Sequence, residues 1–436
     1  MRRGKKLKQW VFFLLPMPED PEQLEHEIGV GESLKKELTL SPGQISVIRL
    51  VDNLMENAYE LRASDVHIDP SEKDLRVRFR IDGVLHDNYL FPKELQSEII
   101  TRIKVLSGMR TDEHQAAQDG RFKVTLKHAD QVASIDIRVS IAPTYYGENC
   151  VMRLLAETSE VLTLEKLGFA AGDLDKINRA IKKPYGLVLA TGPTGSGKTT
   201  TLYALLRKLN TKEVSIITIE DPVEYSMNGI DQIQVNARTG LTFAQGLRFI
   251  LRQDPNIIMV GEIRDNETAG IAVNAAMTGH MVLSTLHTND ASTTLPRLLD
   301  MGVEPFLIAS TVNIAIGQRL VRTICEDCKV ERTLTKAEID ALEGVTSKDI
   351  LQGKTNFYIG LGCKKCDGSG FRGRIGIHEV LEVNEEIREL IMKRVNADDI
   401  RRTAIKNGMT TMLEDGLQKA LEGKTTVEEV LRVFHE

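Results

Sequence analysis

The stretch GPTGSGKTT, residues 192–200, decides the fold of this chain. It has the spacing G-x-x-x-x-G-K-[ST] and lies between the apolar run GLVLATG (186–192) and the run KTTTLYALLRKL (198–209). A phosphate-binding loop needs a strand before it and a helix after it. Glycines let successive backbone N–H groups turn towards an anion, and the helix start adds partial positive charge. The pattern predicts a nucleotide-binding α/β domain, and the flanking elements argue against a glycine-rich turn that matches by chance.

The loop predicts specific contacts with ATP. Lys198 is expected to reach the β- and γ-phosphates, and Thr199 is expected to be a ligand of Mg²⁺. ATP and Mg²⁺ are therefore the expected cofactors of this site. The other candidate nucleotide-binding residues are the rest of the loop, namely Gly192, Pro193, Thr194, Gly195, Ser196, Gly197 and Thr200.

Short apolar runs extend on both sides of the loop. Those in its own domain are rich in β-branched residues and alternate with helical stretches: YGLVLATG (185–192), VSIITIED (214–221), NIIMVGE (256–262) and HMVLSTLHT (280–288). This alternation predicts a parallel sheet that is covered on both faces. Upstream, a run with helical spacing precedes four strand-like runs, which predicts a small α/β domain. These runs are ISVIRLVDNLMENAYELR (45–62), SDVHIDP (64–70), LRVRFRIDG (75–83), RFKVTL (121–126) and SIDIRVSIAP (134–143).

The composition narrows the class of protein. A chain of 436 residues is too long for one hydrophobic core and suggests about two to four domains. Its net charge of −6 argues against a general nucleic-acid binder. The start, MRRGKKLKQWVFFLLP, resembles a signal peptide, but its apolar run is short and no small-residue cleavage site follows. Nothing else approaches the roughly 20 apolar residues of a membrane span, so we expect a cytoplasmic protein.

Candidate catalytic side chains follow the predicted strands. Glu262 comes at the carboxyl end of a buried strand, where ligands bind in open α/β sheets. Gly261 replaces the usual Walker B aspartate, so Glu262 is the carboxylate best placed to act on metal-bound water. A second acidic cluster lies in ITIEDPVEY (217–225), although such a strand exit is as often only a solvated turn. His280 and His287 flank another strand, and a lone histidine there is more often structural than catalytic.

Four of the five cysteines form two pairs, CEDC and CKKC, separated by 34 residues. Five cysteines in a chain of this length do not indicate a disulfide framework. The spacing can place four thiolates tetrahedrally around one Zn²⁺ with no open position, which predicts a structural zinc site. The predicted ligands are Cys325, Cys328, Cys363 and Cys366.

The cysteine pairs have three other interpretations. Four reduced core thiols would need no metal, and neither pair begins the βαβ unit that a redox motif requires. A nucleic-acid zinc ribbon is the stronger rival, but residues 329–362 have mixed charge and little aromatic–basic interleaving, which favours contact with protein. Cys150 stands apart and is expected to be a small core residue.

The motifs ASDVHIDP, GPTGSGKTTTLY, ITIEDPVEY and DPNIIMVGEIRDNETAGIAVNAAMTGHMVLSTLHTNDA, in this order and spacing, resemble the secretion ATPases of type II secretion and type IV pilus systems. The resemblance covers residues 45–436. It implies that Glu224, in the aspartate box, and Glu262, in the Walker B box, handle magnesium and water. It also implies that His287 senses the γ-phosphate. Gly261 is usual in this family.

The resemblance also places the chain in one branch of the family. The tetracysteine insert occurs in motors that assemble pili or drive secretion, whereas retraction motors generally lack it. Such motors act on an inner-membrane platform, and many carry a large extra N-terminal domain that docks there. This chain departs from that pattern, because only about 42 residues precede its first α/β domain.

Related motors are hexamers in which arginines of the N-terminal domain approach ATP bound to the motor domain. Arg138 and Arg153 match those positions, and Arg248 and Arg252 are additional candidates. From spacing alone, salt-bridged or solvated side chains are the simpler interpretation of all four. We expect a homo-hexamer that binds platform proteins at the inner membrane face and no nucleic acid.

The expected fold is α/β, with a RecA-like P-loop motor, a small α/β domain before it, and a zinc-binding insert and helical tail after it. The expected function is ATP hydrolysis that powers type II secretion or type IV pilus assembly. The alternatives are a DNA-uptake or conjugation-type ATPase, a zinc-containing nucleic-acid translocase, and a nucleotide-sensing scaffold without turnover. The expected parts are a basic start and linker at 1–42, an N-terminal α/β domain at 43–160, the ATPase core at 161–320, the tetracysteine element at 321–376 and a helical region at 377–436.

Overall fold

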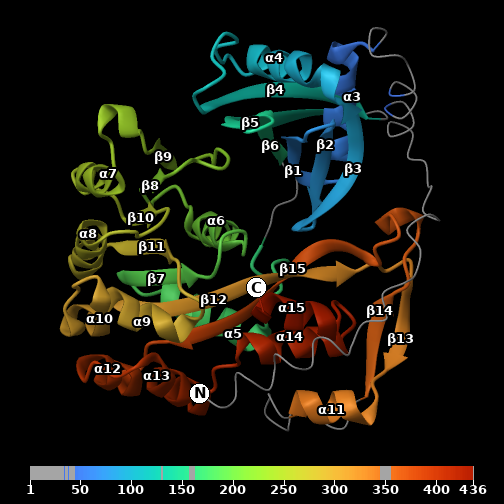
Figure 1. Ribbon diagram of the computed structural model, residues 1–436. Coiled ribbons are helices and arrows are strands. Elements are labelled where there is room, and N and C mark those ends of the chain that lie inside the picture. The colour runs from blue at the N-terminus through green and yellow to red at the C-terminus, as the bar shows by residue number, and fades with distance from the viewer. Residues whose placement is uncertain are drawn as a thin grey trace.

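The structure is a computed structural model that describes Leu34, Leu38 and residues 45–128, 131–156, 163–343 and 355–435. Apart from those two leucines, the predicted basic start and linker lie outside the described residues. The described residues form two large β-sheets, one above the other in Figure 1, each with its own hydrophobic core, and a separate two-stranded ribbon. No helix among the described residues is long and apolar enough to cross a membrane.

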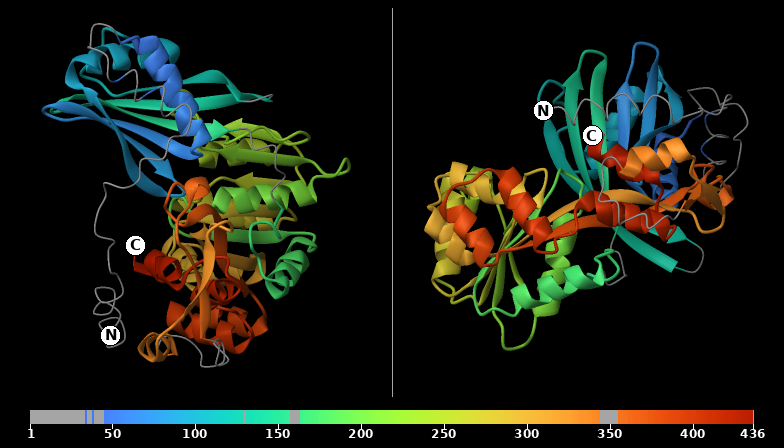
Figure 2. Two further views of the ribbon diagram at one scale, coloured as in Figure 1. Left: turned by 90° about the vertical axis from the view of Figure 1, so that its right-hand side faces the viewer. Right: turned by 90° about the horizontal axis from the view of Figure 1, so that it is seen from below.

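The first sheet is antiparallel and has six strands in the order β3-β2-β1-β6-β5-β4. Its side chains alternate, so that Val66 and Ile68 of β1 are buried beneath the apolar stripe of α3, which includes Leu50 and Leu54. Helices α3 and α4 cover the face that points away from the second sheet (Figures 1 and 2). The elements are α3 (Val47–Glu60), β1 (Ala63–Pro70), β2 (Asp74–Ile81), β3 (Val84–Pro92), η4 (Lys93–Leu95), α4 (Gln96–Leu106), β4 (Gln118–His128), β5 (Gln131–Thr144) and β6 (Gly147–Ala156).

The second sheet has seven strands in the order β15-β12-β7-β11-β10-β8-β9. Six strands are parallel, and only the edge strand β15 is antiparallel to its neighbour. The four strands predicted from apolar runs are buried along their whole length, as expected where helices cover both faces. The strands are β7 (Gly186–Thr191), β8 (Ile216–Glu220), β9 (Asp231–Gln234), β10 (Ile257–Val260), β11 (Met281–Leu286), β12 (Val312–Ile324) and β15 (Phe371–Glu382).

Two hydrophobic clusters fill the two sides of this sheet. One contains apolar residues of α5 (Ala171–Ile181) and α6 (Lys198–Leu209). The other contains residues from other helices of the motor and from the first helices of the tail: α7 (Phe243–Ile250), α8 (Asn266–Met277), α9 (Ala291–Asp300), α10 (Pro305–Thr311), α12 (Glu385–Met392) and α13 (Ala397–Lys406). The short helix η5 (Ala237–Thr239) follows β9. The predicted fold class, an α/β motor with a parallel sheet behind a small α/β domain, is confirmed.

The cysteine segment connects β12 and β15, the two strands at one edge of this sheet. Between β12 and β15 the chain forms the ribbon β13 (Lys329–Thr333) and β14 (Asn356–Gly360), with α11 (Lys336–Glu343) and η6 (Lys364–Cys366). The ribbon projects from the sheet in Figure 1, and α14 (Met412–Leu421) and α15 (Val427–His435) pack beside its base. The backbones of Gly360 and Gly370 come so close that a Cβ on Gly360 would lie 2.0 Å from the carbonyl oxygen of Gly370.

Among the described residues, hydrogen bonds join the first domain to the rest of the molecule at two places. The Arg138 guanidinium donates to the carbonyl of Val223 at 2.6 Å. The backbone N–H of Gly373 donates to the Asp82 carboxylate at 2.8 Å. The antiparallel domain therefore contacts both the loop after β8 and the chain that leads from the cysteines into β15.

Candidate functional site

The predicted phosphate loop connects β7 to α6. Gly192, Gly195 and Gly197 all have positive φ, at 146°, 79° and 86°, in a region that side chains rarely adopt. A Cβ on Gly192 would lie only 2.3 Å from the carbonyl oxygen of Gln318 on β12. The turn therefore favours glycine at all three positions, and at Gly192 the neighbouring strand also leaves no room for a side chain.

Lys198 begins α6 and is buried within the loop. Its ammonium donates to the carbonyls of Gly192 at 2.9 Å and Pro193 at 3.0 Å. Burial lowers the pKa of Lys198, while the nearby Glu262 carboxylate acts in the opposite direction. The positive charge is thus held inside the turn, close to the exposed stretch Pro193–Gly195. This is the placement that a contact with phosphate requires.

Glu262 and His287 come together at the carboxyl edge of the sheet. They follow β10 and β11, which are adjacent parallel strands. His287 Nε2 donates to Glu262 Oε2 at 3.1 Å, and Arg264 pairs with the other carboxylate oxygen. The Glu262 side chain is only 12% exposed. Arg264 was missed by the sequence reasoning, although its position two residues after a candidate catalytic glutamate was a usable signal.

The carboxylates of the acidic cluster at the end of β8 differ in burial and in their hydrogen-bond partners. Glu220 is fully buried and accepts hydrogen bonds from Tyr203, from Thr218 at 2.6 Å and from Gln232 at 3.2 Å. The alternative of a solvated turn is therefore wrong for Glu220. The pKa of Tyr203 is raised, mainly by burial and next by its hydrogen bond to the Glu220 carboxylate.

The other carboxylates of that cluster face outwards. Asp221 is exposed, while Glu224 is half-buried and lies 3.5 Å from Arg138 of the first domain. The Glu224 backbone N–H donates to the Tyr203 hydroxyl at 3.3 Å, and Tyr203 belongs to α6. The helix that starts at the phosphate loop is therefore linked to the loop that carries Glu224.

The other arginine candidates are engaged elsewhere within the chain. Arg153 donates to Asp65 of its own domain at 2.9 Å, although its side chain remains 60% exposed. Arg248 pairs with Glu267 at 2.6 Å. Arg252 donates to the Arg248 carbonyl at 3.0 Å and lies over a phenylalanine ring on α7. Of the four, only Arg138 contacts a candidate catalytic residue within one chain.

Two residues that we expected to be structural have structural environments. His280 Nδ1 lies 2.9 Å from the carbonyl of Ala275, at the turn that enters β11. Cys150 is fully buried in the first domain, and burial raises the pKa of its thiol. Neither side chain faces the phosphate loop.

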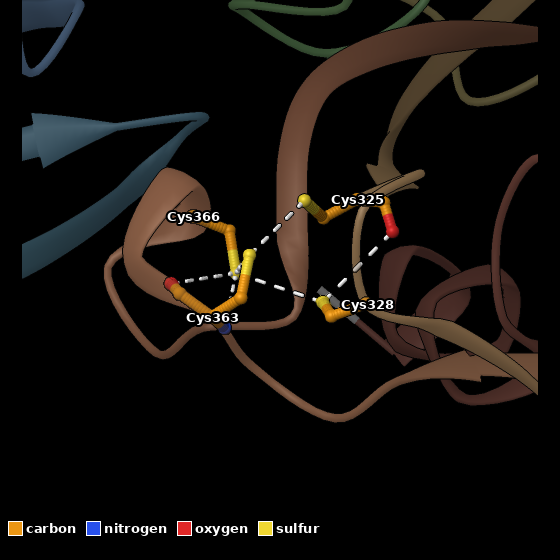
Figure 3. A group of neighbouring side chains, drawn as sticks. All are labelled: Cys325, Cys328, Cys363 and Cys366. Carbon is orange, nitrogen blue, oxygen red and sulfur yellow. Dashed lines mark hydrogen bonds between the residues drawn. The ribbon is translucent and has the colours of Figure 1, made fainter.

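The four paired cysteines form one cluster (Figure 3), although 34 residues separate the pairs. Their sulfur atoms all lie within 4.8 Å of one another, and three of the separations are 3.8, 3.8 and 3.7 Å. Zn–S bonds of about 2.3 Å in a tetrahedron require S···S separations of about 3.8 Å. A disulfide would need about 2.05 Å. The geometry fits one tetrahedral metal ion.

The protonation of this cluster depends on whether a metal ion is bound. Burial raises the pKa of Cys325 and raises that of Cys328 to about 12. Burial acts in the same direction on Cys366, but hydrogen bonds from the backbone N–H groups of Cys363 and Gly370 and from neighbouring thiols outweigh it and lower that pKa to about 7. A bound metal would deprotonate its thiol ligands, so the observation that supports a metal site is the sulfur geometry.

Comparison with known proteins decides the family. The model of the family "Type II/IV secretion system protein" matches residues 41–432. The chain belongs to this family. The type IV pilus assembly ATPase PilB of Myxococcus xanthus is 46% identical over 397 residues, which cover 91% of this chain and 69% of that protein. The type II secretion system ATPase E of Vibrio cholerae is 43% identical over 401 residues, covering 92% of this chain and 78% of that protein.

Solved structures agree with the fold of this secretion ATPase. The Legionella pneumophila ATPase DotB superposes with a TM-score of 0.64 at 21% identity, covering 91% of this chain and 98% of that one. The pilus retraction motor PilT with bound ADP superposes with a TM-score of 0.58 at 26% identity, covering 87% and 95%. The chain is thus an ATPase of the type II secretion and type IV pilus assembly class. Its relatives do not favour the alternative of a nucleic-acid translocase or DNA-uptake motor.

Proposed function

We propose that this ATPase binds Mg–ATP at the loop 192–200 and hydrolyses it at the carboxyl edge of the seven-stranded sheet. One observation supports this most strongly: Lys198 and the Glu262–His287 pair belong to the same edge, contributed by β7, β10 and β11. At this edge, a phosphate bound by Lys198 can meet the Glu262 carboxylate, which would act as the base, and the His287 side chain. This edge is also where ligands bind in open α/β sheets.

Each of these side chains has a proposed task. Lys198 neutralises phosphate charge, and Thr199 would hold Mg²⁺ together with substrate oxygens. When bound, that ion neutralises charge that develops on the transferred phosphoryl group. Glu262 accepts a proton from the attacking water, and Glu224 supports the same region as a second carboxylate. His287 holds Glu262 by its hydrogen bond and reports on the γ-phosphate.

The tetracysteine cluster would hold one structural Zn²⁺. Its four sulfur ligands leave no open position, so the ion would supply stability rather than chemistry. The hydrogen bonds from backbone N–H groups to Cys366 Sγ, at 3.1 and 3.3 Å, are the outer contacts that such thiolates need. We place the chain with motors that assemble fibres or drive secretion because its relatives PilB and secretion ATPase E carry those names.

The assembly that we propose is a homo-hexamer recruited to platform proteins on the cytoplasmic face of the inner membrane. In it, an arginine of the first domain, Arg138 or Arg153, would complete the ATP site. We propose the same division of the chain as above, with the first domain at 43–160, the ATPase core at 161–320, the zinc element at 321–376 and the helical region at 377–436. The two independent cores of the first domain and the motor support the boundary near 160.

The proposed function is tested by nucleotide binding and phosphate release. The purified full chain should bind ATP and release phosphate, whereas Lys198→Ala should lose most of both. Lys393→Ala is the matched control and should behave as the parent, because Lys393 is an exposed lysine just after α12 that pairs with Glu389. Equal ATP binding by the parent and Lys198→Ala would refute the assignment of the loop.

A further inference from the structure

One buried side chain beside the phosphate loop has no part in the site described so far. Gln318 lies in the middle of β12 and is 2% exposed. It follows Ser196 of the loop by 122 residues, and its strand lies beside β7 in the sheet. A buried amide has four hydrogen-bonding positions to satisfy, so its partners show what it holds in place.

The Gln318 amide bridges two positions of the loop and its helix. Its Nε2 donates to the carbonyl of Ser196 at 2.7 Å, and its Oε1 accepts from the Thr201 hydroxyl at 2.9 Å. The orientation of the amide is fixed chemically, because a backbone carbonyl can only accept a hydrogen bond. The Gln318 backbone also lies against Gly192. One residue of β12 therefore contacts the start of the loop, Ser196 within it and the first turn of α6.

The direction of the first bond has a consequence for anion binding. In a trans peptide the C=O and the next N–H point in opposite directions. Holding the Ser196 carbonyl towards β12 therefore turns the Gly197 N–H away from β12. We propose that Gln318 is a positioning residue for ATP: its amide fixes the Ser196–Gly197 peptide so that this N–H faces the phosphate. The proposal rests on the proposed function, in which this loop binds the nucleotide.

Loss of this bond leaves a buried carbonyl without a partner and frees the peptide to rotate. Either effect has a free-energy cost that corresponds to about a tenfold weaker binding of ATP. Gln318→Leu should therefore raise the KM for ATP about tenfold, with kcat reduced by less than about threefold. The separation of KM from kcat is expected because the Gln318 amide bonds to Ser196 and Thr201, whereas the Glu262 carboxylate pairs with His287 and Arg264.

Gln318→Glu gives a test that a merely structural role would not pass. At pH 8 the carboxylate presents only acceptors to the Ser196 carbonyl, so ATP affinity should fall at least tenfold. Burial beside a carbonyl favours the protonated acid. At pH 6 the acid can donate to Ser196 and accept from Thr201, so affinity should recover to within about threefold of the parent.

The pH comparison needs the parent and one matched control. Lys198 of the loop and His378, the register partner of Gln318 on β15, are ionisable groups near this position. Titrating the parent in parallel removes their contribution. Gln418→Glu makes the same chemical change on the exposed side of α14 and should leave ATP affinity and its pH dependence unchanged.

The outcomes separate this inference from the proposed function. If the parent binds ATP and Lys198→Ala does not, but Gln318→Leu binds as the parent does, this inference alone is overturned. A Gln318→Glu protein that binds poorly at pH 8 and stays as poor at pH 6 also overturns it. If Gln318→Leu fails to fold, two other variants test the inference. One is Gln318→Glu at the two pH values. The other is Thr201→Val, which should raise the KM for ATP about two- to fivefold.

Discussion

Replacing Glu262 by glutamine tests the catalytic assignment most directly. The side chain is 12% exposed, with one carboxylate oxygen 3.1 Å from His287 Nε2 and the other paired with Arg264. Glutamine has the same size and can still accept a hydrogen bond, but it cannot take a proton from water. General-base catalysis contributes about 10²–10⁴-fold, so hydrolysis should fall at least about 100-fold. That loss is equivalent to about 2.7 kcal/mol of transition-state stabilisation.

Although Glu262→Gln should lose hydrolysis, its affinity for ATP should stay unchanged or increase. Glu262 is the carboxylate that acts on the charge of Lys198, so its removal takes a negative charge away from the position of the phosphates. We expect Glu262→Gln to bind ATP with the affinity of the parent or more tightly, because the repulsion between carboxylate and phosphate is lost.

The assay measures phosphate release in multiple and single turnovers, together with the Kd for ATP. Glu382→Gln is the matched control, since Glu382 of β15 is also ion-paired, with Arg179 at 2.9 Å, and has no proposed part in hydrolysis. A Glu262→Gln protein that releases phosphate at close to the parent rate in a single turnover would refute the assignment. So would a loss of ATP binding equal to the loss of hydrolysis, because Glu262 would then be a binding residue.

Three other predictions concern the metal, the ring and pH. Elemental analysis should find about one zinc per chain, and chelation should make the tetracysteine segment sensitive to protease before the phosphate loop; a metal-free protein with four titratable thiols would contradict this. Mixing Arg153→Ala chains with Lys198→Ala chains should restore part of the ATPase activity if a neighbouring chain supplies the arginine, whereas full activity of Arg153→Ala alone would exclude the role. Burial acts to raise the pKa of Glu429, but Arg322 and Arg432 outweigh it and lower that pKa to about 2. Glu429→Gln should therefore reduce the free energy of unfolding by about 2–3 kcal/mol above pH 5, and the difference should shrink as pH falls from about 4.5 towards 2, as urea unfolding at several pH values would show.

The parts of the fold that were predicted correctly are local in sequence. The glycines of the phosphate loop sit between β7 and α6 because both the turn and its flanking apolar runs lie within 24 residues, 186–209. The four buried motor strands are predominantly apolar, which is the pattern of a covered parallel sheet. The cysteine cluster was also predictable, because ligand spacing alone carries the information that a metal site requires.

Other strands were missed for a physical reason. β12 contains Asn313, Gln318 and Arg319 among its apolar residues, so it lacks the uniform pattern of the central strands. It nevertheless lies beside β7, and its polar groups are satisfied there: Asn313 donates to the Tyr185 carbonyl at 3.0 Å. A buried polar residue can be recognised only once its partner is known, and this partner is more than 120 residues away.

The same reason explains why spacing alone could not assign roles within the site. Glu220 and Glu224 occupy one short acidic stretch that spacing does not divide, and only the family resemblance singled out Glu224. The structure separates them through Tyr203 of α6, whose hydroxyl donates to the buried Glu220 and accepts from the backbone of Glu224. Because Tyr203 of α6 reaches the end of β8, one carboxylate is buried, while the other lies 3.5 Å from Arg138. The burial of each carboxylate depends on contacts between segments that the motif does not contain.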